Sequence, residues 1–319
     1  MVQSPVALAA TDALEEGAGF YGERVRLVPG LLWAALRGAW RDRVLGLAAE
    51  AGFWQLLSLP SAILAILGTI GFFNEPLGAD NLDHLQRSID NGLTHVIVPS
   101  AVQSTIAPAL HRILFGGRID VVSISFIVAL WTGSSAMATY VNTITIAYGM
   151  RHARGAVSSR LLALRLYVGF VLASIVLIPL LVLGPDDLVD VVPDRWHGGV
   201  KLATSIAYWP LVVVISLALL ATLYHLAVPV RTPWRRALPG ALVALSIWLV
   251  GSVVLREWLE WAFRRTATYG PLSAPIAVLL FLYLTAVAIL YGAELNAEID
   301  RSWPRPETEA LRAAELAGP

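Results

Sequence analysis

The stretch "GPLSAPIAVLLFLYLTAVAILYGAELNAEIDR", residues Gly270 to Arg301, decides the fold of this chain. The part before Glu294 contains no Asp, Glu, Lys or Arg, and a helix of roughly 20 apolar residues is long enough to cross the hydrocarbon core of a bilayer. The stretch then becomes acidic at Glu294, Glu298 and Asp300. It therefore predicts a membrane-spanning helix that ends in carboxylates, and such carboxylates need partners.

The composition is that of a membrane protein. Of its 319 residues 57% are hydrophobic and 14% are charged, whereas a soluble domain has about 45–50% apolar and about 25% charged residues. The mean hydropathy is +0.67. Cysteine is absent, which excludes disulfides and thiolate metal sites, and the net charge of zero argues against nucleic acid as a partner. We expect an integral membrane protein without a cofactor.

Stretches without charged residues predict an all-α, polytopic membrane bundle of six transmembrane helices, residues 51–300. A cytoplasmic arm, 1–50, precedes the bundle, and a polar cytoplasmic tail, 301–319, is expected to fray. An external helical segment, 75–119, separates the first two spans. The six predicted spans are 51–74, 121–150, 166–185, 202–230, 237–255 and 270–293.

Further helices are expected at the membrane surface. Residues 82–93 have amphipathic spacing, and the uncharged but polar stretch 92–111 is expected to be interfacial or re-entrant. Before the first span, one helical face carries Leu32, Leu36, Trp40, Val44 and Leu47. This helix is expected either to lie at the inner leaflet or to pack on the protein's own cytoplasmic face.

Arginines predict the orientation. The short loops at 151–165 and 231–236 are rich in arginine and contain no acid, whereas the loop "GPDDLVDVVPDR" at 184–195 is acidic. Short loops that carry positive charge stay on the cytoplasmic side. Both termini are therefore predicted to lie in the cytoplasm.

Four segments together resemble a known family. They are "RDRVLGLAAEAGFWQLLSLPSAIL", "ALWTGSSAMATYVNTITIAYG", "TYGPLSAPIAVLLFLYL" and "LYGAELNAEID". The chain is similar in these segments to the YihY or BrkB-type six-span proteins of the bacterial inner membrane. Phe53 and Trp54 stand where this family usually has an Ala-Tyr-like pair, which indicates a divergent branch. The resemblance implies an all-helical membrane bundle and a suspected role in moving envelope-related solutes or lipids; the family was long labelled a ribonuclease.

The residues themselves argue against a nuclease. The six histidines are scattered and never occur at metal-ligand spacing such as i, i+4. Glu294, Glu298 and Asp300 could hold one metal, but acids at a helix end are more often structural partners. We expect no enzymatic activity and no metal site.

Polar residues inside the spans favour a transporter, because unpaired polar groups in hydrocarbon tend to face protein or water. Ser135, Thr139 and Asn142 share a face of the second span, with Trp131 one turn further out, and His225 lies near the inner end of the fourth. They are candidates for a substrate pathway, with a polar vestibule at Asn142, His225 and Glu294. The alternatives are small residues that pack helices together and a histidine bonded to a carbonyl.

The acidic helix end predicts a layer of ion pairs. Glu294 and Glu298 are four residues apart and repel each other, and Arg301 reaches only Glu298. We expect the cations Arg151, Arg154, Arg160 and Arg165 of the inner loop to pair with them, with Asn296 as a hydrogen-bonding member. This layer is expected either to close the inner side permanently or to open as a gate.

Two classes of function stay open, a transporter and a membrane scaffold without a substrate. No Walker motif is present, so transport would be passive, ion-coupled or driven by a partner. The expected partners are membrane lipid and an unidentified solute or lipid, and the chain could form an oligomer.

Overall fold

The structure is a computed structural model and describes residues 29–72, 119–151, 153–190, 197–230, 232–264 and 273–317. All regular secondary structure in these ranges is helical. Residues 29–41 form a first helix. The others are α2 (Val44–Phe72), α7 (Ile119–Ala147), α8 (Ala156–Asp190), α9 (His197–Ala227), the 3-10 turn η3 (Trp234–Ala237), α10 (Leu238–Arg264), α11 (Ser273–Ser302) and α12 (Pro306–Ala317).

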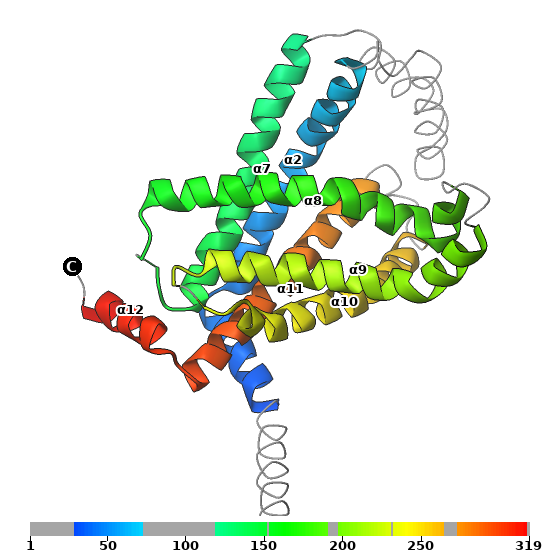
Figure 1. The fold of residues 1–319 in the computed structure, drawn as a ribbon. Helices are drawn as coiled ribbons and strands as arrows, with labels where there is room; N and C mark the ends of the chain where they lie inside the picture. The colour runs from blue at the N-terminus through cyan, green and yellow to red at the C-terminus, as the bar shows by residue number, and fades with distance from the viewer. Residues whose placement is uncertain are drawn as a thin grey trace, which may run out of the picture.

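The long helices form a bundle with α11 in its middle (Figure 1). α2 packs along α7 and against α11, α10 packs along α11, and α8 lies between α7 and α9. Two buried clusters join these helices. One contains Tyr224, Ala241 and Ala297 of α9, α10 and α11, and the other contains Ala48, Tyr140 and Leu290 of α2, α7 and α11.

Within the part of the chain that the structure describes, five helices are long and apolar enough to cross a membrane, which confirms the predicted all-α membrane bundle. They contain the stretches Ile124–Ala147, Ala156–Ser174, Tyr208–Ala227, Trp234–Ala262 and Pro275–Ser302. α2, a helix of 29 residues, covers the predicted first span as far as Phe72. The count of six spans stays a prediction.

Several boundaries differ from the predicted ones. α8 begins at Ala156 instead of 166 and continues to Asp190, and α11 continues past 293 to Ser302. The prediction stopped each span at the first charged residue. A helix continues through charged residues where they find partners, as Arg160 and Asp300 do.

The tail was expected to fray, and this expectation is wrong. Residues 306–317 form α12, which starts with a proline at its first position and carries Glu307 and Glu309 in its first turn. These are favourable residues for a helix N-terminus. Thr308 is fully buried and Arg312 bonds to α11, so α12 docks on the bundle.

The helix at 29–41 packs on the bundle, as one of the two expectations for it requires, and its position at the inner leaflet stays a prediction. Its small residues Ala35, Gly38 and Ala39 are buried against the bundle, whereas Trp33 and Trp40 are 60% and 78% exposed. One face thus packs on the protein while large apolar side chains point outward, as an amphipathic helix at a membrane surface requires. The external segment 75–119, with its predicted helices 82–93 and 92–111, lies almost wholly outside the described residues.

Candidate functional site

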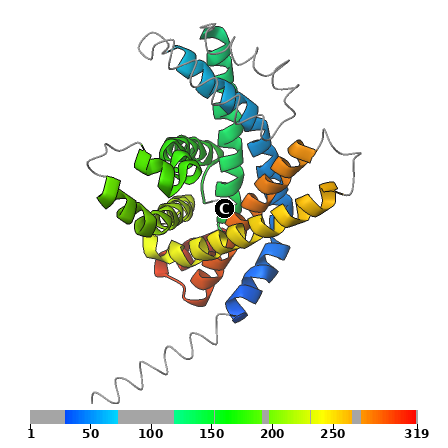
Figure 2. The ribbon, with the colours of Figure 1, turned by 90° about the vertical axis from the view of Figure 1, so that its right-hand side faces the viewer.

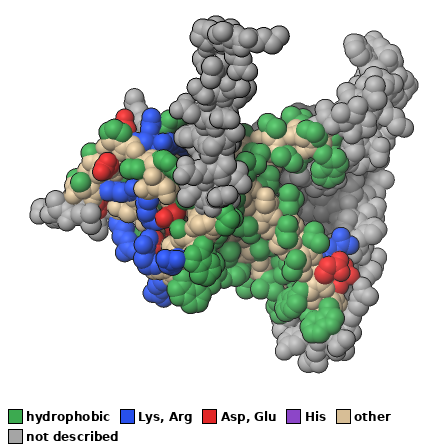
Figure 3. Space-filling model, turned by 90° about the horizontal axis from the view of Figure 1, so that it is seen from below, with side chains coloured by type: hydrophobic (Ala, Val, Ile, Leu, Met, Phe, Trp, Pro, Cys, Tyr) green, Lys and Arg blue, Asp and Glu red, His purple; other side chains and the backbone are tan. Residues whose placement is uncertain are grey.

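A group of arginines lies at one end of the bundle, which we call the basic end. It consists of the α7–α8 connection at 148–155, the α9–α10 connection at 228–237 and the end of α11 with α12. Figure 3 shows arginines and carboxylates at this end and mainly hydrophobic side chains over much of the remaining described surface. Away from the basic end, α2 and α7 diverge from α8 and α9 in both ribbon views (Figures 1 and 2).

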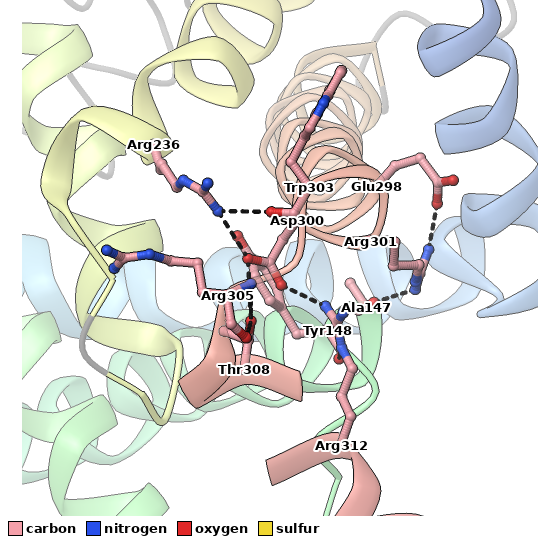
Figure 4. A network of polar contacts seen from close by, with 10 residues as sticks. All are labelled: Ala147, Tyr148, Arg236, Glu298, Asp300, Arg301, Trp303, Arg305, Thr308 and Arg312. Atoms are coloured by element: carbon pink, nitrogen blue, oxygen red, sulfur yellow. Dashed lines mark hydrogen bonds and ion pairs between the residues drawn. The ribbon is translucent and has the colours of Figure 1, made fainter. Parts of the chain in front are cut away.

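Asp300 is the centre of a polar network at the basic end (Figure 4). Its side chain is 4% exposed and accepts hydrogen bonds from Arg312 of α12 at 2.8 Å and from Arg236 of η3 at 3.4 Å. Arg312 also donates to the carbonyl oxygen of Tyr148, and Arg236 donates to that of Trp303. One buried carboxylate therefore connects α11, η3 and α12, and through Arg312 the end of α7.

Arg301 makes a second connection between α11 and α7. It donates to Glu298 at 2.6 Å and to the carbonyl oxygen of Ala147, the last residue of α7. Glu298 is therefore paired within its own helix.

The predicted ion-pair layer with the inner loop is wrong. Arg154 donates instead to the carbonyl oxygens of Leu226, Ala227 and Val228 at 2.9–3.2 Å, where it caps the C-terminal end of α9. The helix dipole favours a cation there. Burial lowers the pKa of the Arg154 guanidinium from its usual value.

The other three predicted cations do not pair with Glu294 or Glu298 either. Arg151 and Arg165 are exposed. Arg160 lies within α8, where it donates to Ser135 at 2.9 Å and stands 4.8 Å from the centre of the Trp131 ring.

Asn296 fastens the crossing of α10 and α11. Its Oδ1 accepts from the backbone N–H of Gly240 at 2.8 Å, and its Nδ2 donates to the carbonyl oxygen of Ala237 at 3.2 Å. Gly240 and Gly292 face each other across this crossing, and a Cβ on either glycine would collide with the backbone oxygen of the other. Asn296 thus bonds to backbone groups, as a hydrogen-bonding member of the basic end but not within an ion-pair layer.

A small cavity lies beside this crossing. It has a volume of about 10 Å³, enough for about one water molecule, and includes Tyr148, Tyr224, Arg236, Asn296 and Asp300 in its lining. The Tyr224 hydroxyl donates to the carbonyl oxygen of Ile289 at 2.7 Å. The helices are therefore packed closely at the basic end.

Glu294 has no hydrogen bond. Its side chain is fully buried, and neither carboxylate oxygen has a partner. Gly38 of the 29–41 helix covers it so closely that a Cβ there would lie 2.9 Å from Oε2. Glu294 is therefore the one predicted gate residue that is buried and has no hydrogen-bond partner among the described residues.

The predicted pathway residues are not gathered around one space. Ser135 and Thr139 are buried and donate to carbonyl oxygens of their own helix, and Thr139 also contacts Glu50 of α2 at 3.2 Å. Asn142 is exposed, and Trp131 is 65% exposed. The cavity described above contains none of them, so their role in a substrate pathway stays a prediction.

The predicted vestibule brings together residues that the structure places in different surroundings. Asn142 is exposed, Glu294 is buried, and His225 is half-buried with a buried Nδ1 that has no hydrogen-bond partner. The alternative for His225, a hydrogen bond donated to a backbone carbonyl, is therefore absent at Nδ1.

Sequence reasoning missed Asp300, Arg236 and Arg312 as members of one network. A signal was present, because "PETEALRAAELA" has the proline and acids of a helix start and an apolar face that predict a docked helix. Among the described residues, no group of three or more His, Asp or Glu side chains could hold a metal ion.

The fold and the basic end define a class, a polytopic helical membrane protein with buried polar contacts at one end. The chain belongs to the family described as virulence factor BrkB, which it matches over residues 35–317. It is similar to the ribonuclease-like protein YfkH of Bacillus subtilis (strain 168), with 24% identity over 263 residues, 82% of this chain and 91% of that protein. No solved structure matches it.

Proposed function

We propose that the protein is a transporter that moves an envelope-related solute or lipid across the bacterial inner membrane. In this proposal the basic end faces the cytoplasm, as the arginine-rich connections predict. The structure then corresponds to the state that is closed toward the cytoplasm.

The observation that carries the proposal is the buried Asp300 network. Charged side chains within membrane-spanning helices are costly, and they commonly belong to pathways or switches. Asp300 is 3% exposed and connects η3 and α12 to α11. Polar contacts of this kind can exchange partners and release three elements together, which is what a gate at a membrane boundary requires.

A membrane scaffold is the second candidate. It is favoured by the buried hydroxyls of Ser135 and Thr139, which bond to carbonyl oxygens of their own helix. Hydroxyls satisfied in this way do not need a solute. The name of YfkH also raises RNA cleavage, which is not part of either proposal.

Flux through liposomes separates the two candidates. The purified full chain is reconstituted with a fluorescently labelled phosphatidylglycerol in the bilayer and carboxyfluorescein in the lumen. Asp300→Asn removes the charge that holds both arginines, so it should speed the movement of at least one probe relative to the parent protein. Dithionite bleaching measures the lipid, and dye release measures the solute.

Glu298→Gln is the matched control, because Glu298 pairs only with Arg301 and leaves the Asp300 network intact. It should leave both rates unchanged. If neither probe moves faster with the parent or with Asp300→Asn than in liposomes without protein, the transporter is contradicted and the scaffold is favoured.

A further inference from the structure

Glu294 lies on α11 two turns before the helix ends at Ser302. Its side chain is 0% exposed, and both of its carboxylate oxygens lack a hydrogen-bond partner. A carboxylate removed from water without donors is far more costly than the neutral acid, so such a group tends to bind a positive charge. Glu294 therefore lacks the charged partners that Asp300 has in its two arginines.

The charged groups around Glu294 do not pair with it. Four charged groups interact electrostatically with Glu294. Arg41 and Asp42 lie at the end of the 29–41 helix, and Glu298 and Arg301 lie on α11. Arg41 pairs with Asp42 at 3.2 Å, and Arg301 pairs with Glu298 at 2.6 Å. The two pairs are each neutral, and Glu294 is left over.

The space around Glu294 fits a proton better than a metal ion. A hard metal cation takes about six or more oxygen ligands, and within the described part of the chain no three acidic or histidine side chains are placed to bind one. Gly38 is packed so closely over Oε2 that even a methyl group there would lie at 2.9 Å.

We infer that Glu294 is a proton-binding site covered by the 29–41 helix, and that loss of the proton lifts this helix from α11. The inference deepens the proposed transport function by naming the ion to which transport is coupled, and it rests on that function for its biological meaning.

The 29–41 helix is joined to α2 by a turn at Arg43, whose φ of 56° is uncommon for a residue other than glycine. On one side the helix is held by the hydroxyl of Tyr291, which donates to the carbonyl oxygen of Leu32 at 2.8 Å, and by the small residues Ala35 and Ala39. In the proposed opening these contacts break, and the backbone at the turn changes.

Cysteine labelling of the full-length protein tests the inference, since the chain has no cysteine of its own. Ala35→Cys places a thiol on the buried face of the 29–41 helix, and Arg37→Cys places one on its exposed face. Both are labelled with a methanethiosulfonate reagent at about pH 6 and about pH 8.5, and the ratio of the two rates removes the pH dependence of the thiol itself.

With Glu294 present, the ratio should rise about tenfold between the two pH values, because a deprotonated Glu294 destabilises the covered state. With Glu294→Gln, which cannot ionise, the ratio should stay low at both. A ratio that does not rise in the parent, or that rises equally in Glu294→Gln, overturns the inference.

Gly38→Leu gives an independent check that does not depend on the Gln variant folding. Its side chain is too large to be accommodated by a small shift of the Glu294 carboxylate, which already lies 2.9 Å from the position of a Cβ, so the ratio should be high at both pH values. A low ratio in a folded Gly38→Leu protein contradicts the covering role of the helix.

The labelling needs no transported solute, so the two proposals can fail separately. A pH-dependent ratio without any flux supports the proton site and contradicts the transport function. Flux with a constant ratio supports the transport function and contradicts the proton site.

Discussion

Asp300 Oδ2 accepts a hydrogen bond of 2.8 Å from Arg312 Nη2, and this contact folds α12 back onto the end of α11. The other oxygen of the same carboxylate faces Arg236 at 3.4 Å (Figure 4). Because one buried acid pairs with two cations from two different elements, a single substitution at Asp300 affects both contacts. The packing of η3 and α12 against α11 therefore depends strongly on this residue.

Asn296→Ala is expected to destabilise the protein by ~2 kcal/mol, because it leaves the N–H of Gly240 and the carbonyl of Ala237 without their partner. Asn142→Ala is the matched control, since Asn142 is exposed, and should change stability by less than ~0.5 kcal/mol. Thermal unfolding in detergent measures both. Equal effects of the two substitutions would show that Asn296 does not fasten the helix crossing.

Gly240→Ala is expected to lower the stability of the bundle by ~1–3 kcal/mol, because its methyl group would overlap the backbone of Gly292. Gly169→Ala in α8 meets nothing within 4 Å, so it should be neutral or stabilise the helix by up to ~1 kcal/mol. The melting temperature should therefore fall in Gly240→Ala and stay unchanged or rise in Gly169→Ala. A Gly240→Ala protein as stable as its parent argues against the close crossing.

The membrane helices could be predicted from local sequence, and the contacts between them could not. Uncharged stretches predicted the membrane helices, because the need to satisfy backbone groups in lipid acts on each segment separately. The partners of the arginines could not be predicted in this way. Arg154 bonds carbonyls of α9 more than 70 residues away, and sequence separation carries no information about such a contact.

The acidic helix end shows the same limit for the candidate site. The sequence indicated that carboxylates on α11 need partners, and Asp300 has them. It predicted arginines of the inner loop as partners of Glu294 and Glu298, whereas Arg236 and Arg312 pair with Asp300, because charge and spacing do not tell which side of a helix is covered. Burial of Glu294 depends on the small residue Gly38 in a distant segment, and this contact exists only in the packed structure.

Arg154→Gln is expected to destabilise the C-terminal end of α9 by ~1.5–3 kcal/mol, because three carbonyl oxygens lose a charged donor. Hydrogen exchange of the amides near Leu226 measures the local effect. Arg151→Gln removes an exposed arginine from the same connection and should leave the exchange unchanged. Faster exchange in both variants would point to the loss of charge alone.

Replacing Trp33 and Trp40 together with Ala is expected to weaken contact of the 29–41 helix with lipid while the protein still inserts, because the buried face of the helix is retained. Protease cleavage near Arg41 in liposomes should become faster. Trp209→Ala, an equally exposed tryptophan on α9, is the control and should not affect this cleavage. Unchanged cleavage in the double variant counts against a lipid-facing helix.

If the basic end is a gate held by Asp300, the accessibility of a residue behind it should depend on Asp300. A single cysteine replaces Thr145, which is 7% exposed near the end of α7, and its labelling from the basic end is followed in purified protein. The account predicts slow labelling with Asp300 and with the Glu298→Gln control, and about tenfold faster labelling with Asp300→Asn at an unchanged folded yield, as a coupling of ~1.4 kcal/mol implies. Unchanged labelling with Asp300→Asn, or a loss of folded protein without faster labelling, would contradict the gate and leave a purely structural closure.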